Sequence, residues 1–328
     1  MAARVWVRGL SWALSVVLAS PGVGSASCTG AAGPLDSAVA LVLSGGGAKG
    51  AWEAGVAAAF LGAGVPVRVV AGSSAGALNA AMVADGRMDR LEALWRSVTR
   101  EQVYALRPSV FFAGLLPGWL TLLTLNQADS LLDPAPLRQL IADSLDLERV
   151  RASPVRLVVV TSDLARYRTR VFDNGTVTLD ALMAAAAVPG AFPAVDIEGD
   201  LLVDGGLAGR APILEALAAG VPVGRAVVVM SYALEEQAAP PTTLRRALEG
   251  AFEMAMIHQI RRDTELARLK HPGVDIQTLT PSAPLALRPL DFDPVRLARA
   301  LELGKRDGLE CLEAWKASGD RGVSVPER

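Results

Sequence analysis

The fold is decided by residues 39–76, which read VALVLSGGGAKGAWEAGVAAAFLGAGVPVRVVAGSSAG. The short, continuous apolar run 39–43 predicts a buried strand, and it ends directly in the glycine-rich segment 44–50. Apolar residues at helical spacing follow, and a second apolar run, 67–71, predicts another buried strand. This strand enters the tight turn 72–76. The alternation of strand, glycine loop, helix, strand, turn and helix predicts an α/β fold with a mainly parallel sheet between helices.

The turn contains Gly72, Ser74 and Gly76 in the pattern Gly-x-Ser-x-Gly. Between a strand and a helix, this pattern is typical of a nucleophile elbow, where a sharp turn exposes the serine hydroxyl at the head of the helix. The helix N-terminus favours negative charge that develops nearby. Ser74 is therefore the candidate nucleophile, whereas the neighbouring Ser73 has the wrong spacing to the glycines.

The glycine-rich segment after the first strand can be compared with two nucleotide-binding motifs. Its spacing matches the dinucleotide pattern GxGxxG, but no acidic residue ends the second strand, as that site requires. A phosphate-binding P-loop also fails, because Lys49 is followed by Gly50 instead of Ser or Thr. Unobstructed backbone N–H groups of Gly45, Gly46 and Gly47 fit an oxyanion hole better. Lys49 would add positive potential or hold the loop.

A serine nucleophile needs a base, and the two histidines are poor candidates. His258 falls within a long predicted helix and His271 at its end. Asp204 is the better candidate, because it ends a short predicted strand and precedes Gly205 and Gly206, which let the backbone turn away from its side chain.

Three motifs in this order, SGGGAKG at 44–50, GSSAG at 72–76 and DGG at 204–206, resemble the bacterial type of the patatin-like phospholipase family. The resemblance continues between them and covers about residues 38–212. It implies a three-layer α/β/α sandwich and a Ser74–Asp204 dyad without histidine. It also implies an oxyanion hole from the glycine loop, with Lys49 at the family's basic position. One departure is Arg210, where the family often has Asn; this bears on the loop that carries Asp204.

Composition excludes several other classes. Hydrophobic residues make up 51% of the 328 residues and charged residues 20%, which predicts a sizeable core and argues against disorder. The net charge is -2 without a Lys/Arg run, so nucleic acid is not an expected partner. No Cys/His cluster predicts a metal site, and no cofactor is expected. Two cysteines exclude a disulfide framework as the main stabilising device.

The N-terminus predicts export. Residues 1–27 have the layout of a signal peptide: a positive start, a short apolar stretch and small residues before Cys28. Cys28 is a candidate lipidation site, with ordinary cleavage as the alternative. The mature protein is then a membrane-anchored lipoprotein or periplasmic or secreted. Residues 28–37 are expected to be a tether, 38–232 the catalytic domain, and 233–328 a mostly helical extension packed on it.

The predicted function is hydrolysis of ester bonds in phospholipids or lysophospholipids through an acyl-enzyme. The apolar segment 111–120 suits a lipid-facing lid, although a core helix or acyl-pocket wall explains it somewhat better. A membrane surface is an expected partner. Two alternatives stay open: a general carboxylesterase, and a lipid-binding surface lipoprotein with an idle active site. The sequence leaves the acyl-chain preference and the oligomeric state open.

Overall fold

A computed structural model of the chain describes residues 27–29, 37–113, 128–232 and 242–319. All but the last residue of the predicted signal peptide lies outside these ranges, as does most of the apolar segment 111–120. Within them, a nine-stranded sheet has the order β1-β11-β10-β2-β3-β6-β9-β8, with β7 also paired to β6. The strands of this sheet are β1 (Ser27–Thr29), β2 (Val39–Leu43), β3 (Val67–Gly72), β6 (Arg156–Asp163), β7 (Arg168–Asp173), β8 (Val195–Ile197), β9 (Asp200–Asp204), β10 (Arg225–Val229) and β11 (Asp275–Thr280).

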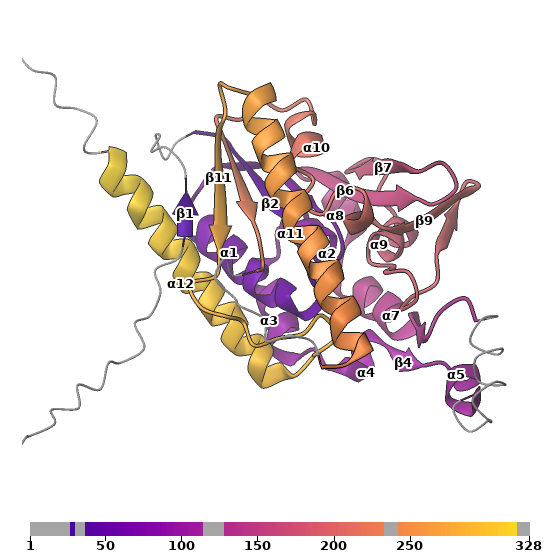
Figure 1. Cartoon of the computed structure of the whole chain (residues 1–328). Helices are drawn as coiled ribbons and strands as arrows, with labels where there is room; N and C mark the ends of the chain where they lie inside the picture. The colour runs from indigo at the N-terminus through magenta and orange to yellow at the C-terminus, as the bar shows by residue number, and fades with distance from the viewer. Residues whose placement is uncertain (1–26, 30–36, 114–127, 233–241, 320–328) are drawn as a thin grey trace, which may run out of the picture.

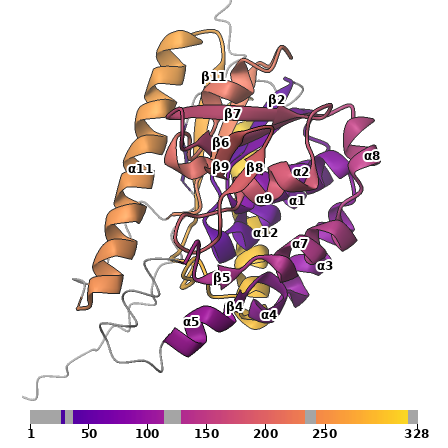
Figure 2. The same ribbon diagram turned by 90° about the vertical axis from the view of Figure 1, so that its right-hand side faces the viewer.

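Helices cover both faces of this sheet. Figure 2 shows α11 on one side of the sheet and α1 and α2 on the other. A small hairpin of β4 (Ala105–Leu106) and β5 (Leu132–Asp133) lies apart from it. The helices are α1 (Gly50–Gly62), α2 (Ala75–Asp85), α3 (Met88–Ser97), α4 (Arg100–Val103), α5 (Pro108–Ala113), α7 (Ala135–Ser144), α8 (Leu147–Arg151), α9 (Leu179–Ala185), α10 (Ile213–Leu217), α11 (Leu244–Lys270) and α12 (Pro294–Gly319), with the 3-10 turns η1 (Gly47–Lys49) and η2 (Gly205–Leu207).

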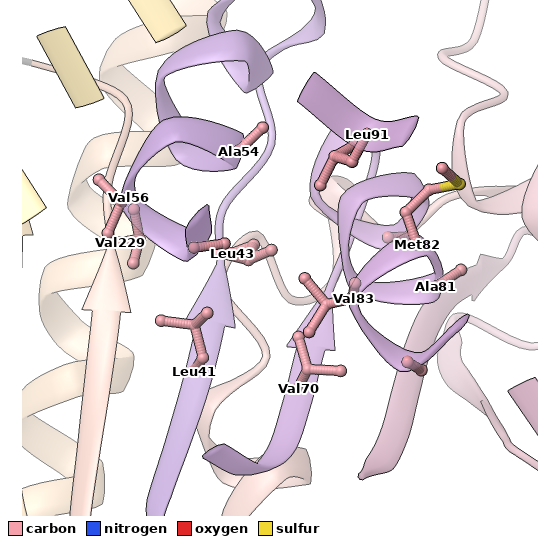
Figure 3. Packing of buried hydrophobic residues seen from close by; sticks show 14 of the residues in the cluster. Leu41, Leu43, Ala54, Val56, Val70, Ala81, Met82, Val83, Leu91 and Val229 are labelled. Atoms are coloured by element: carbon pink, nitrogen blue, oxygen red, sulfur yellow. The ribbon is translucent and has the colours of Figure 1, made fainter. Parts of the chain in front are cut away.

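The sequence of β2 explains why the sheet has helices on both faces. Alternate side chains of a strand point to opposite faces, and every residue of β2 is buried. Leu41 and Leu43 pack into the core beneath α1 and α2, as Figure 3 shows, whereas Ala40 and Val42 pack into a second core beneath α10 and α11. A strand that is apolar on both sides needs cover on both sides. The predicted three-layer α/β/α fold is confirmed.

The central strands are parallel, and this places the functional residues. Strands β11, β10, β2, β3 and β6 run in the same direction, while β1, β7, β8 and β9 pair antiparallel at the margins. The carboxyl ends of the parallel strands therefore meet at one edge of the sheet. Open α/β sheets bind ligands in the crevice outside this edge.

The segment expected to be an extension, residues 233–328, contributes to the same sheet through β11, which pairs with β10. Its last helix, α12, lies along α1, and the two helices approach closely (Figure 1). A side chain at Gly304 would come within 2.0 Å of the carbonyl oxygen of Trp52, so glycine is required for this approach. The buried Trp52 Nε1 donates to Asp307 Oδ2 at 2.7 Å, which fixes α12 against the catalytic segment.

The structure joins Cys28 to Cys311 in a disulfide across 283 residues of sequence. Cys28 lies in β1, which pairs antiparallel with β11, and Cys311 is buried on α12. Two cysteines so far apart give no sequence signal of pairing. A lipid thioether at Cys28 would use the same sulfur atom, so the disulfide and lipidation exclude each other. The start of the expected tether is instead part of the sheet.

Among the described helices, none is both long and apolar enough to cross a membrane.

Candidate active site

Ser74 lies at a strained turn between β3 and α2. Its backbone has φ 55° and ψ -137°, a left-handed conformation that residues other than glycine rarely adopt. Such strain is typical of the serine in a nucleophile elbow. The flanking glycines are required by close approach: a side chain at Gly72 would come within 2.2 Å of the Gly76 oxygen, and one at Gly76 within 2.4 Å of the Leu43 oxygen. The turn therefore holds Ser74 at the N-terminus of α2.

Strand register brings Asp204 to the same edge of the sheet. Gly72 of β3 lies opposite Val159 of β6, and Thr161 of β6 lies opposite Asp204 of β9. Ser74 is two residues beyond Gly72, and Thr161 is two residues beyond Val159. The three strands therefore place Ser74 and Asp204 at the same level, although they are 130 positions apart in the sequence.

Asp204 is buried, and only one of its carboxylate oxygens is engaged. Oδ1 accepts the Gly206 N–H at 2.7 Å, whereas Oδ2 has no hydrogen-bond partner among the described residues. Burial raises the pKa of Asp204 above its ordinary value. The Arg210 guanidinium, the Gly206 N–H and the Ser74 hydroxyl each oppose this rise in pKa. A buried carboxylate with a free oxygen beside a serine hydroxyl is suited to accept its proton.

The glycine loop offers two free donors rather than three. The Gly45 N–H donates to Glu53 Oε1 at 2.8 Å, and the Ala48 N–H donates to the Pro289 oxygen at 2.9 Å. The N–H groups of Gly46 and Gly47 make no hydrogen bond to another described residue. Both residues line the same cavity as Ser74. Of the three N–H groups predicted to form an oxyanion hole, those of Gly46 and Gly47 are therefore free to donate to an oxyanion, and that of Gly45 is not.

Glu53 is a buried residue beside the glycine loop that the sequence motifs did not single out. It lies on α1 with its side chain fully buried, and Oε2 has no partner among the described residues. Burial raises its pKa from 4.5 to about 8, against the opposing effects of Ser44, Arg210 and Gly45. Glu53 is therefore mainly protonated at neutral pH. A lone glutamate within an otherwise apolar helix was the signal that could have identified it.

Lys49 and Arg210 both lie beside Tyr232. Lys49 Nζ is 4.2 Å from the centre of the Tyr232 ring and forms a 3.1 Å ion pair with Glu253. Arg210 Nη2 donates to the Tyr232 hydroxyl at 3.2 Å.

The backbone of Arg210 also connects the segments that carry Ser74 and Asp204, because Ser73 Oγ donates to its carbonyl oxygen at 2.6 Å. Arg210 thus anchors the loop after Asp204 to the elbow. Its side chain is buried and lines the cavity.

A cavity of about 940 Å³ opens at Ser74. Its wall is largely apolar and comes from α2, α3, α4, α7 and the segments before α12; it includes Leu78, Met82, Leu94, Val98, Leu140 and Phe292. Neither His258 nor His271 lines this cavity. The described residues contain no group of three or more His, Cys, Asp or Glu side chains that could hold a metal ion.

The sequence model of one protein family, described as patatin-like phospholipase, matches residues 41–217, which is more than half of the chain. The chain belongs to the patatin-like phospholipase family. The matched patatin-like segment includes the glycine loop, the elbow and Asp204. The resemblance seen in the three motifs is confirmed.

Among individual proteins, relatives are found in the NTE family. The chain is 29% identical over 176 residues to uncharacterized NTE family proteins of Mycobacterium bovis and Mycobacterium tuberculosis. The alignment covers 53% of this chain and 44% of those proteins, so the chain spans less than half the length of these relatives.

Two solved structures are similar to this patatin-like protein. VipD from Legionella pneumophila has a TM-score of 0.45 and 14% identity, over 89% of this chain and 70% of VipD. ExoU, in complex with SpcU from the type III secretion system of Pseudomonas aeruginosa, has a TM-score of 0.38 and 16% identity, over 93% of this chain and 56% of that chain.

Proposed function

We propose that this protein is a serine hydrolase that cleaves ester bonds of phospholipids or lysophospholipids with Ser74 and Asp204 as its catalytic dyad. The observation that carries the proposal is the juxtaposition of Ser74 and Asp204 at one edge of the sheet, with Ser74 lining the cavity. A serine held in a strained turn lies level with a buried carboxylate whose Oδ2 is unpartnered. Membership of the patatin-like phospholipase family supports lipid hydrolysis.

In the proposed reaction, Ser74 Oγ attacks the ester carbonyl carbon while Asp204 Oδ2 accepts the hydroxyl proton. The carbonyl oxygen becomes an oxyanion. It accepts hydrogen bonds from the N–H groups of Gly46 and Gly47 and faces the N-terminus of α2. When the C–O bond breaks, Asp204 returns the proton to the departing alcohol. Water then attacks the acyl-enzyme with Asp204 again as base, releasing the fatty acid.

The cavity supports a lipid substrate. Its apolar wall suits a fatty acyl chain, because burial of each methylene contributes about 0.8 kcal/mol. The exposed residues Arg100 and Arg288 also line the cavity and suit the phosphate of a headgroup. Arg100 is already paired with Glu101 at 2.9 Å, so Arg288 is the cation that favours a phospholipid over a neutral carboxylester.

A membrane surface is the proposed site of action. Four apolar residues that line the cavity are also 38–44% exposed: Leu164, Leu207, Phe252 and Leu290. Apolar groups exposed together beside a substrate cavity are typical of interaction sites. They would enter the lipid surface while a substrate moves into the cavity.

Export is also proposed, on the layout of residues 1–27. The Cys28–Cys311 disulfide supports it, because such bonds persist in oxidising compartments outside the cytosol. Among the exported forms, the disulfide favours a periplasmic or secreted protein over one lipidated at Cys28. Mass spectrometry of the mature, non-reduced protein distinguishes them: a diacylglyceryl group on Cys28 would contradict the disulfide-bonded form.

The test is hydrolysis of a panel containing a diacyl phospholipid, a lysophospholipid and a short-chain neutral ester. Wild type is compared with Ser74→Ala, which removes only the hydroxyl oxygen, and with Asp204→Asn, which preserves the size of the side chain. We expect free fatty acid from the phospholipids and near-complete loss in both variants. Equal activity in Ser74→Ala would refute the dyad. Preference for the neutral ester would indicate a carboxylesterase. A fluorophosphonate that fails to label wild type at Ser74 would indicate an idle site.

A further inference from the structure

The register of two parallel strands places Ser231 beside the glycine loop. Val229 of β10 lies opposite Leu43 of β2, and the Ser44 N–H donates to the Val229 oxygen at 3.2 Å. Ser231 lies two residues after Val229 and Gly45 lies two residues after Leu43, so Ser231 and Gly45 are also neighbours. Ser231 Oγ donates to the carbonyl oxygen of Gly45 at 2.5 Å. Ser231 is separated from this loop by most of the catalytic segment in the sequence, so only the sheet brings them together.

A closed set of hydrogen bonds holds Gly45 on both sides. Glu53 Oε1 accepts the Gly45 N–H at 2.8 Å and the Ser44 hydroxyl at 2.9 Å. The Ser231 N–H donates to Ser44 Oγ at 3.3 Å, and its hydroxyl completes the ring at the Gly45 oxygen. Ser44, Glu53 and Ser231 are all buried. Water therefore does not compete for these bonds, and both backbone polar groups of Gly45 are fixed.

Fixing the Gly45 carbonyl also fixes the Gly46 N–H. The two groups belong to one peptide plane, and no cis peptide occurs among the described residues. In a trans peptide, C=O and N–H point in opposite directions. A carbonyl held towards Ser231 therefore turns the Gly46 N–H to the other side. Gly45 and Gly46 have positive φ angles of 73° and 128°. Because glycine has no Cβ, this backbone can rotate readily unless hydrogen bonds hold it.

We propose that Ser231, together with Glu53, is a positioning residue that keeps the Gly46 N–H directed at the oxyanion during acyl transfer. Without the Ser231 hydroxyl, the Gly45–Gly46 peptide can rotate and present its carbonyl oxygen to the developing negative charge. The interaction acts mainly on the transition state, because the ground-state ester carries little charge on its oxygen. This inference rests on the proposed function.

The experiment compares Ser231→Ala with wild type, using a micellar lysophospholipid and a fatty-acyl trifluoromethyl ketone. The ketone forms a tetrahedral oxyanion adduct with a serine nucleophile and so reports the donors directly. We expect kcat to fall roughly 10- to 100-fold, as for a weakened oxyanion donor, with KM changed less than about twofold. The inhibition constant of the ketone should rise by a similar factor.

The matched control is Ser130→Ala. Ser130 is also buried and donates to a backbone oxygen, that of Leu132 at 3.0 Å, but it does not line the cavity. This variant should keep the wild-type kcat and ketone affinity. If Ser231→Ala does not fold, Ser231→Cys, which keeps the side-chain shape with a weaker donor, must show a fall in kcat and in ketone affinity.

The outcomes separate the two proposals. A folded Ser231→Ala protein with wild-type kcat and wild-type ketone affinity would overturn the positioning role alone. Wild-type protein that hydrolyses no lipid ester, or that equals Ser74→Ala, would instead overturn the proposed function. A fall in melting temperature without a change in ketone affinity would show that Ser231 is merely structural, and would also overturn the positioning role.

Discussion

Replacing Glu53 with glutamine should change how stability depends on pH. Burial raises the pKa of Glu53 from 4.5 to about 8, so the folded state holds a proton that the unfolded state releases. As pH rises through this window, the free energy of unfolding falls by about 1.4 kcal/mol per unit, or about 5 kcal/mol in all. Below pH 4.5 both states are protonated and the contribution is fully present. Glutamine is neutral throughout, so Glu53→Gln removes this loss.

The measurement is urea unfolding of both proteins between pH 5 and 8. The free energy of unfolding of Glu53→Gln, minus that of wild type, should rise by roughly 4 kcal/mol across this range. The raised pKa of Asp204 adds its own pH dependence, but both proteins share it and it cancels in the difference. Glu313→Gln, at an exposed position on α12, reports the effect of removing a surface charge. Parallel curves for wild type and Glu53→Gln would refute a protonated, buried Glu53.

Two further predictions concern Arg210 and the disulfide. Arg210→Gln removes a cation that lowers the pKa of Asp204, so the acid limb of the kcat/KM profile should move to higher pH; an unmoved limb would show that Asp204 is not the base. Cys311→Ser opens the disulfide to Cys28 and should cost about 2–5 kcal/mol of stability, seen as a lower melting temperature. Dithiothreitol should lower the wild-type melting temperature similarly and leave the variant unchanged; insensitivity in wild type would contradict the bond.

The sequence predicted the architecture of the first half closely. The strand expected at 39–43 is β2, and the Ala-rich helix expected after the elbow is α2. Both have unambiguous local signals: a continuous apolar run in one, and a helix beginning after a glycine turn in the other. The later expectation of a helical extension after residue 232 did not include β11, because a six-residue strand carries a weaker signal than the long helices beside it.

For the site, the sequence selected Ser74, Asp204 and the glycine loop. Ser74, Gly46 and Gly47 line one cavity, and strand register places Asp204 level with Ser74. It did not show which loop amides are free. That depends on Glu53 and Pro289, which occupy the neighbouring N–H groups from α1 and from the segment before α12. Pro289 is distant in the chain and leaves no local pattern, whereas Glu53 has the one signal of a lone glutamate in an apolar helix.

The sequence by itself determined the layered α/β fold and the chemistry of the nucleophile, because both follow from local periodicity and from a turn that only certain residues can adopt. Which side chains come together at the site was decided by the tertiary structure alone. Parallel register puts Ser231 against Gly45, antiparallel register puts Asp204 level with Ser74, and burial gives Glu53 its proton. These effects arise from contacts between segments that the chain joins only after folding, where loss of water changes the strength of each hydrogen bond and the charge of each carboxyl group.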